Sequence, residues 1–183
     1  MRVINFFLLL IVFSLSHLYA QEDIKKDPGY INMGSFEGLY NPEEYTEVNI
    51  EAPLLNLVAK VSKNKDEELY NLLSGLKLIR VYTFQVAEDK VSGVEQKIKS
   101  LTNKLNSENW ERIVKVKDRG EAVNVYLKNV NDNIVGVTVL TMEKNGEASF
   151  VNIVGNIDLE AITRLSDKFN IPELDMIKKD KSK

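Results

Sequence analysis

The chain has 183 residues, a formal net charge of −3 with charges of both signs interspersed, one histidine and no cysteine. The interspersed charges form no basic patch of the kind that indicates a nucleic-acid partner. The histidine, His17, is lost if the chain is cleaved after Ala20, and the remainder then excludes Ser-His-Asp triads, cysteine nucleophiles and zinc or haem sites built from His or Cys.

Residues 1–20, MRVINFFLLLIVFSLSHLYA, have the pattern of a cleaved secretory signal. Arg2 supplies the positive charge, an apolar stretch runs from Val3 to Leu15, and Ala20 is the small residue at the cut, although Leu18 is larger than usual for its position. A membrane anchor needs about 20 apolar residues, and a lipid anchor needs a cysteine directly after the signal. We therefore expect export to the periplasm or beyond, with no membrane span and no lipid anchor.

Residues 21–45 form what we call the N-terminal strap, with a short strand expected near Tyr30–Met33. Glycine and proline interrupt it, and it carries four aromatic residues: Tyr30, Phe36, Tyr40 and Tyr45. Aromatic residues in such segments usually cover the end of a core. The alternative is an aromatic stripe that stacks on a ligand.

A single domain is expected over residues 46–177, beginning with a short strand at Thr46–Glu51 and a helix opened by Pro53. Two helices in succession each show one apolar face at a spacing of three and four: Leu54, Leu57, Val58 and Val61, then Leu69, Leu72, Leu73 and Leu76. A strand at residues 77–87 and a third helix follow, the helix with Val91, Val94, Ile98, Leu101 and Leu105 on one face.

From Trp110 onward the apolar period becomes two, which predicts four strands in an antiparallel meander. Their expected bounds are Trp110–Lys117, Glu121–Asn129, Asn133–Glu143 and Glu147–Gly155, and Asn145-Gly146 is a strong hairpin signal. A last helix is predicted at Leu159–Asn170, ended by Pro172, and residues 178–183 form a polar tail expected to be disordered.

These elements predict an α+β fold in which an antiparallel sheet of five or six strands carries helices layered on one face. The second face is also apolar in part, through Ile134, Leu140, Val151 and Ile153. Either the N-terminal strap or another group covers that face.

Asp158, in the stretch VGNIDLEAIT, is interpreted as the N-cap of the last helix, with Glu160 in its first turn. The alternative pairs the two carboxylates as acid and base, but residues two apart on a helix point in different directions. Gly155 lacks the further glycines of a dinucleotide fingerprint and the GK[ST] of a P-loop, so it is assigned to a tight turn.

Residues 129–136, NVNDNIVG, superficially resemble a calcium loop around Asp132. Ile134 stands where the loop needs glycine and Leu140 where it needs a bidentate acid, so a hairpin turn is expected. Trp110 is interpreted as covering a core edge, with sugar or base stacking as the alternative. No catalytic, cofactor-binding or metal-ligating residue is assigned, and no cofactor is expected.

The segments VNIVGNIDLEAITRLSDKFNIPELD and NIEAPLLNLVAK, with the order of elements above, resemble an exported bacterial family known as domain of unknown function 4252. The resemblance covers residues 30–177 and implies a location in the envelope or outside the cell. It supplies no catalytic residues.

The function expected from the sequence is that of a non-catalytic exported protein that binds a protein or small ligand in the bacterial cell envelope. The alternative is a histidine-free hydrolase or isomerase that uses a carboxylate pair, which would need two carboxylates facing one cleft.

Overall fold

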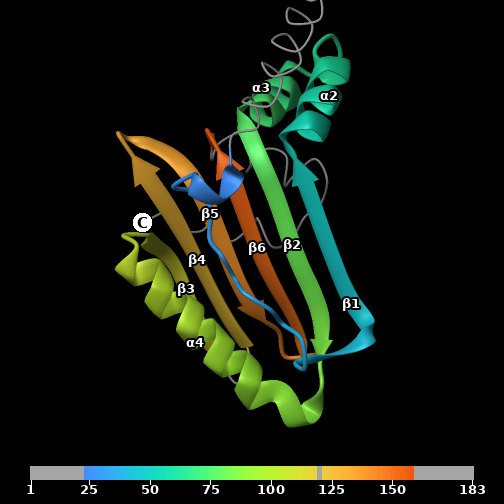
Figure 1. Ribbon diagram of the computed structural model, residues 1–183, viewed down its shortest axis with the longest axis vertical. Helices are drawn as coiled ribbons and strands as arrows, with labels where there is room; N and C mark the ends of the chain where they lie inside the picture. Colours follow the sequence, from blue (N-terminus) through green and yellow to red (C-terminus); the bar gives the residue numbers. More distant parts are fainter. Residues whose placement is uncertain (1–22, 119–120, 159–183) are drawn as a thin grey trace, which may run out of the picture.

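The computed structural model describes residues 23–118 and 121–158, which form an α+β fold around one six-stranded antiparallel sheet (Figure 1). The strand order is β1-β2-β6-β5-β4-β3. The fold class expected from the sequence is therefore confirmed. The strands are β1 (Tyr40–Glu51), β2 (Leu76–Val86), β3 (Glu111–Asp118), β4 (Glu121–Val130), β5 (Asn133–Met142) and β6 (Glu147–Gly155).

The three predicted helices within the described residues also form, except that Leu76, expected on the second of them, is the first residue of β2. They are α2 (Ala52–Ser62), α3 (Glu67–Gly75) and α4 (Val91–Ser107), with two 3-10 turns, η1 (Ile24–Lys26) and η2 (Glu88–Lys90). Asp66 caps α3 by accepting a hydrogen bond from the Leu69 amide at 3.1 Å. Within the described ranges, no helix combines the length and the apolar character needed to cross a bilayer.

The four C-terminal strands form the expected meander, in which each strand pairs antiparallel with the next one in the chain. Val130 pairs with Asn133, which leaves Asn131 and Asp132 as a two-residue turn with φ of 50° and 63°. Two-residue hairpins need this left-handed backbone, and Asn and Asp tolerate it better than other side chains. The calcium-like stretch 129–136 is therefore a hairpin turn, as expected.

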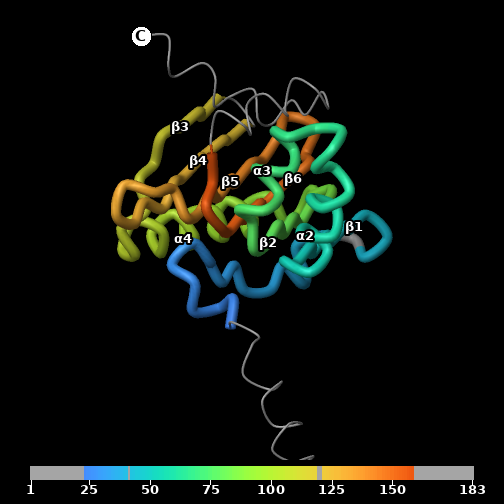
Figure 2. The backbone as a smooth tube through the Cα atoms, turned by 90° about the horizontal axis from the view of Figure 1, so that it is seen from above, coloured from blue at the N-terminus to red at the C-terminus, as the bar shows by residue number. Residues whose placement is uncertain are grey.

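One face of the sheet is covered by α4 and by the N-terminal strap, which lie on the same side (Figure 2). The apolar face of α4 packs against aromatic and aliphatic side chains of the central strands, among them Tyr82, Phe84 and Phe150. The buried residues of α4 are the ones that its periodicity marks: Val94, Ile98, Leu101 and Leu105.

The N-terminal strap is held to this face by side chains of the sheet. Asn152, fully buried on β6, donates from Nδ2 to the Gly29 carbonyl (3.0 Å) and accepts at Oδ1 from the Ile31 amide (3.2 Å). Arg80 on β2 donates from Nη2 to the Ile31 carbonyl (2.8 Å) and lies 4.7 Å from the ring centroid of Tyr30. Because side chains satisfy this backbone, no strand forms at Tyr30–Met33, and that prediction is wrong.

Close backbone contact also fixes the strap. A Cβ on Gly29 would lie 1.9 Å from the Val135 carbonyl oxygen, and one on Gly136 would lie 2.7 Å from the Gly29 Cα. Only glycine lets the two backbones approach this closely.

The opposite face of the sheet is apolar as well, and its central residues are buried. They are Val123, Val125, Leu127, Val137, Val139 and Ile153. Leu55 of α2 and Leu72 of α3 belong to the same cluster, and the two helices lie at one end of the sheet (Figure 1). The helices are therefore divided between the two faces, with α4 on the other one, and are not layered on one face as the sequence pattern predicts. The expected leader 1–20, the helix Leu159–Asn170 and the tail 178–183 lie outside the described residues.

Candidate functional site

The most unusual surface among the described residues is on α2. Of six large hydrophobic side chains that are exposed, four lie on this helix: Leu54 (50% exposed), Leu57 (59%), Val58 (42%) and Val61 (66%). We call these four residues the α2 stripe. They occupy positions i, i+3, i+4 and i+7, so they form one continuous strip along about two turns.

The face of α2 that packs on the protein is a different one, made of Leu55, Ala59 and Ser62. A strip at this spacing usually faces a core, and here it faces solvent. The reason is that α2 is polar only at Asn56, Lys60 and Ser62, so its apolar arc is wider than one contact with the sheet can cover. The width of this apolar arc was the feature of the sequence that indicated an exposed hydrophobic surface. The spacing of the apolar residues alone did not reveal that surface.

Charges of opposite sign lie at the two ends of the α2 stripe. Glu51, the exposed N-cap residue of α2, has no capping hydrogen bond from its side chain. Lys60, Lys63 and Lys65 lie at the C-terminal end and are exposed, and the Lys63 ammonium lies 5.4 Å from the ring centroid of Tyr70. The stripe is therefore a strip of aliphatic surface that is acidic at its start and basic at its end.

A small pocket of about 200 Å³ lies beside α3. It is lined by Glu68, Asn71, Leu72, Gly75, Asn156, Ile157 and Asp158. The turn after β6 is held there by a hydrogen bond from the Asn156 amide to the Gly75 carbonyl (2.8 Å). Asp158, the candidate from the sequence, thus lines the same pocket as a second acidic residue, Glu68.

Gly155 takes φ of 141°, and a Cβ there would lie 2.3 Å from the Gly75 carbonyl oxygen. It thus serves the turn that brings Asn156 against α3. The helix that Asp158 would cap, together with Glu160, lies outside the described residues, so the capping role of Asp158 stays a prediction.

The aromatic residues of the N-terminal strap divide into two groups. Phe36 is buried against Tyr82, Phe84 and Phe150, with ring centroids 4.9, 5.7 and 4.5 Å away. Tyr40 and Tyr45 are half-buried and stack on each other at 4.3 Å. These contacts place the three aromatic side chains against the core, as the first interpretation expects.

The hydroxyl of Tyr45 donates to Glu47 Oε2 at 2.8 Å. Burial raises the pKa of Tyr45 above the ordinary tyrosine value, and the hydrogen bond to the Glu47 carboxylate raises it further. Tyr45 is therefore held in its protonated form, which suits a structural hydrogen bond and opposes proton abstraction by this residue.

Trp110 is 5% exposed and packs with Leu105 and Tyr126 in the core beneath α4. The interpretation as a core residue is confirmed, and the ring is not available for stacking on a sugar or base. Within residues 23–118 and 121–158, no three carboxylates come close enough together to hold a metal ion.

Comparison with known proteins identifies the family of this chain and no individual relative. No curated protein and no solved structure matches it. Residues 37–165 match the family described as domain of unknown function DUF4252. The match covers more than half of the chain, from the strap through all six strands, and the protein therefore belongs to the DUF4252 family.

Proposed function

We propose that this protein is an exported, non-catalytic interaction protein of the bacterial cell envelope, and that it binds a protein partner through the α2 stripe. Export rests on the charged, apolar and small-residue pattern of residues 1–20. Binding rests on the exposed aliphatic strip, since contiguous exposed apolar patches mark interaction sites.

The α2 stripe carries this proposal because its exposure costs free energy that a partner would recover. Leu57 and Val61 are 59% and 66% exposed. Burying a whole Leu or Val side chain contributes about 1.5–3 kcal/mol, so covering the exposed half of each of the four would contribute on the order of 1 kcal/mol per residue. This contribution can stabilise an interface if the surrounding contacts offset the free-energy cost of association.

The test is site-specific photo-crosslinking in the producing cells. A photoreactive side chain at Leu57 should give a discrete crosslinked product with a protein, whereas the same group at Val116, an exposed hydrophobic residue on β3, should not. Equal labelling from both positions, or none from Leu57, contradicts the proposal. Fractionation and mass spectrometry of the same cells test export, which predicts an N-terminus near Gln21 and no acyl mass.

A second candidate is the histidine-free hydrolase or isomerase with a carboxylate pair. One observation favours it: Glu68 and Asp158 line the same pocket beside α3. The pocket is small, and the two side chains come from separate elements. If this candidate is right, Glu68→Gln and Asp158→Asn should each abolish turnover of a chromogenic glycoside or ester while leaving the melting temperature unchanged. No turnover by the unmodified protein removes the candidate.

A further inference from the structure

We infer that the partner that covers the α2 stripe is a second copy of this chain, in an antiparallel helix pair. This inference rests on the proposed function, because it names the partner for the same surface. It follows from three properties of the stripe: its spacing, the charges at its ends and its place in the molecule.

The spacing of the α2 stripe suits pairing with an identical helix. In an antiparallel pair, Leu57 of one copy lies opposite Val58 of the other, and Leu54 lies opposite Val61. Each large side chain thus meets a smaller one, at every turn of the strip. The i, i+3, i+4, i+7 pattern is also that of the seam between two packed helices.

The charges decide the direction of the pair. An antiparallel pair brings Glu51 of one copy to the end of the other helix, where Lys63 and Lys65 are exposed. A parallel pair would set Glu51 against Glu51 and Lys63 against Lys63, which is unfavourable. The antiparallel arrangement also places the positive end of each helix dipole beside the negative end of the other, which is favourable. A two-fold axis then repeats each contact, as in most homodimers.

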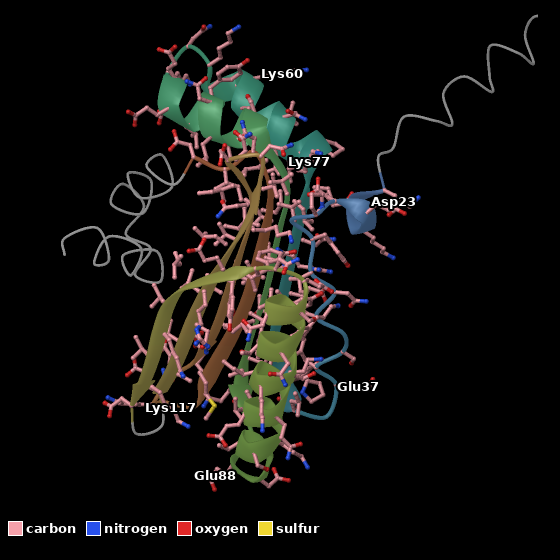
Figure 3. All side chains as sticks on the ribbon, turned by 90° about the vertical axis from the view of Figure 1, so that its left-hand side faces the viewer. Asp23, Glu37, Lys60, Lys77, Glu88 and Lys117 are labelled. Atoms are coloured by element: carbon pink, nitrogen blue, oxygen red, sulfur yellow. The ribbon has the colours of Figure 1, made fainter. Side chains whose placement is uncertain are left out.

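The position of α2 leaves room for the second copy. The helix lies at one end of the long axis of the molecule, beyond the strands of the sheet (Figure 1). Lys60 on α2 lies at that end, and Lys117 on β3 lies toward the opposite end (Figure 3). Two molecules can therefore meet tip to tip without contact between their sheets.

A lipid surface suits the stripe less well. Interfacial helices typically carry Trp, Phe or Leu on their apolar face and many lysines or arginines on the other. Only one lysine, Lys60, lies within α2, and the lysines that come after it are followed directly by Asp66, Glu67 and Glu68. This mixture offers no net attraction to anionic lipid.

The strip is short, so the dimer should be reversible. Stable interfaces bury about 800 Å² on each partner, and four half-exposed aliphatic side chains supply less. We expect the sedimentation coefficient of the processed protein to rise with concentration from low micromolar to near millimolar. Leu57→Lys should keep the protein monomeric over this range. Val116→Lys, which changes an exposed hydrophobic residue elsewhere, should leave the dimer intact.

The absence of cysteine from the chain permits a direct test of the geometry. Under mild oxidation, a mixture of the Leu54→Cys and Val61→Cys variants should form a mixed disulfide much faster than either variant alone, because a disulfide requires Cα atoms within about 7 Å. Lys117→Cys is the control and should not crosslink. Melting temperatures of all variants confirm that they fold.

Three outcomes overturn the inference. The first is a protein that stays monomeric at every concentration. The second is a dimer that resists Leu57→Lys, and the third is a monomer that sediments with phosphatidylethanolamine–phosphatidylglycerol vesicles. If the protein is monomeric but still crosslinks from Leu57 to a different protein, the proposed function stands and the second copy is ruled out as the partner.

Discussion

Replacing Asn152 with alanine should destabilise the fold by detaching the N-terminal strap from the sheet. Asn152 is fully buried on β6 and joins two backbone groups of the strap, the Ile31 amide (3.2 Å) and the Gly29 carbonyl (3.0 Å). Its contacts to the Val137 carbonyl and Thr138 Oγ1 are longer, at 3.3 and 3.4 Å. The two strap bonds should therefore account for most of the loss.

Each buried polar group left without a partner costs about 1–3 kcal/mol. Two such groups give a loss of about 2–6 kcal/mol in the free energy of unfolding, which is a large share of the 5–15 kcal/mol typical of a domain. For a protein of this size, about 2–4 °C of melting temperature correspond to each kcal/mol. The expected fall is thus about 4–24 °C.

Urea denaturation followed by tryptophan fluorescence measures this loss, since Trp110 is buried in the layer that the strap covers. Asn129→Ala is the matched control, because Asn129 makes one exposed contact of 3.4 Å to Glu111. Its loss should stay within about 0.5 kcal/mol. If Asn152→Ala and Asn129→Ala both lower the urea midpoint by the same small amount, Asn152 does not hold the strap and the prediction is refuted.

Three further predictions concern single positions. Gly29→Ala should lower the melting temperature by more than Asn129→Ala does, because its Cβ would lie 1.9 Å from a carbonyl oxygen of β5; an unchanged value in a thermal melt contradicts the close approach. Asp158→Ala should cost roughly 0.5–2 kcal/mol and Asp158→Asn much less if Asp158 is a helix cap, and equal losses in urea would refute capping. Tyr45 should ionise above the ordinary tyrosine pKa in an absorbance titration, and Glu47→Gln should bring its pKa down. Because the protonated form is the one favoured on folding, stability should fall as the pH rises through the ordinary tyrosine range. The fall should be smaller in a Tyr45→Phe variant, in which burial still raises the pKa of Tyr82.

The sequence by itself determined most of the strands and helices in the described part of this protein, because local chemistry specifies them. The hairpin between β4 and β5 follows from Asn131 and Asp132, whose short polar side chains tolerate the positive φ that a two-residue turn needs. The burial of α4 follows from one apolar face of ordinary width, opposite a charged one. In both cases the deciding residues are neighbours in the chain.

Tertiary structure alone decided how the strap is held and which face of α2 is exposed. Ile31 and Asn152 are 121 positions apart, so no local pattern could show that a side chain of β6 would take the place of a strand partner. On α2, both Leu55 and Leu57 are suitable for a core, and the direction from which the sheet and α3 approach buries Leu55 and leaves Leu57 in solvent. Whether a side chain is buried depends on which distant parts of the chain pack against it. For that reason the candidate binding surface on α2 could not be recognised from the periodicity of its apolar residues.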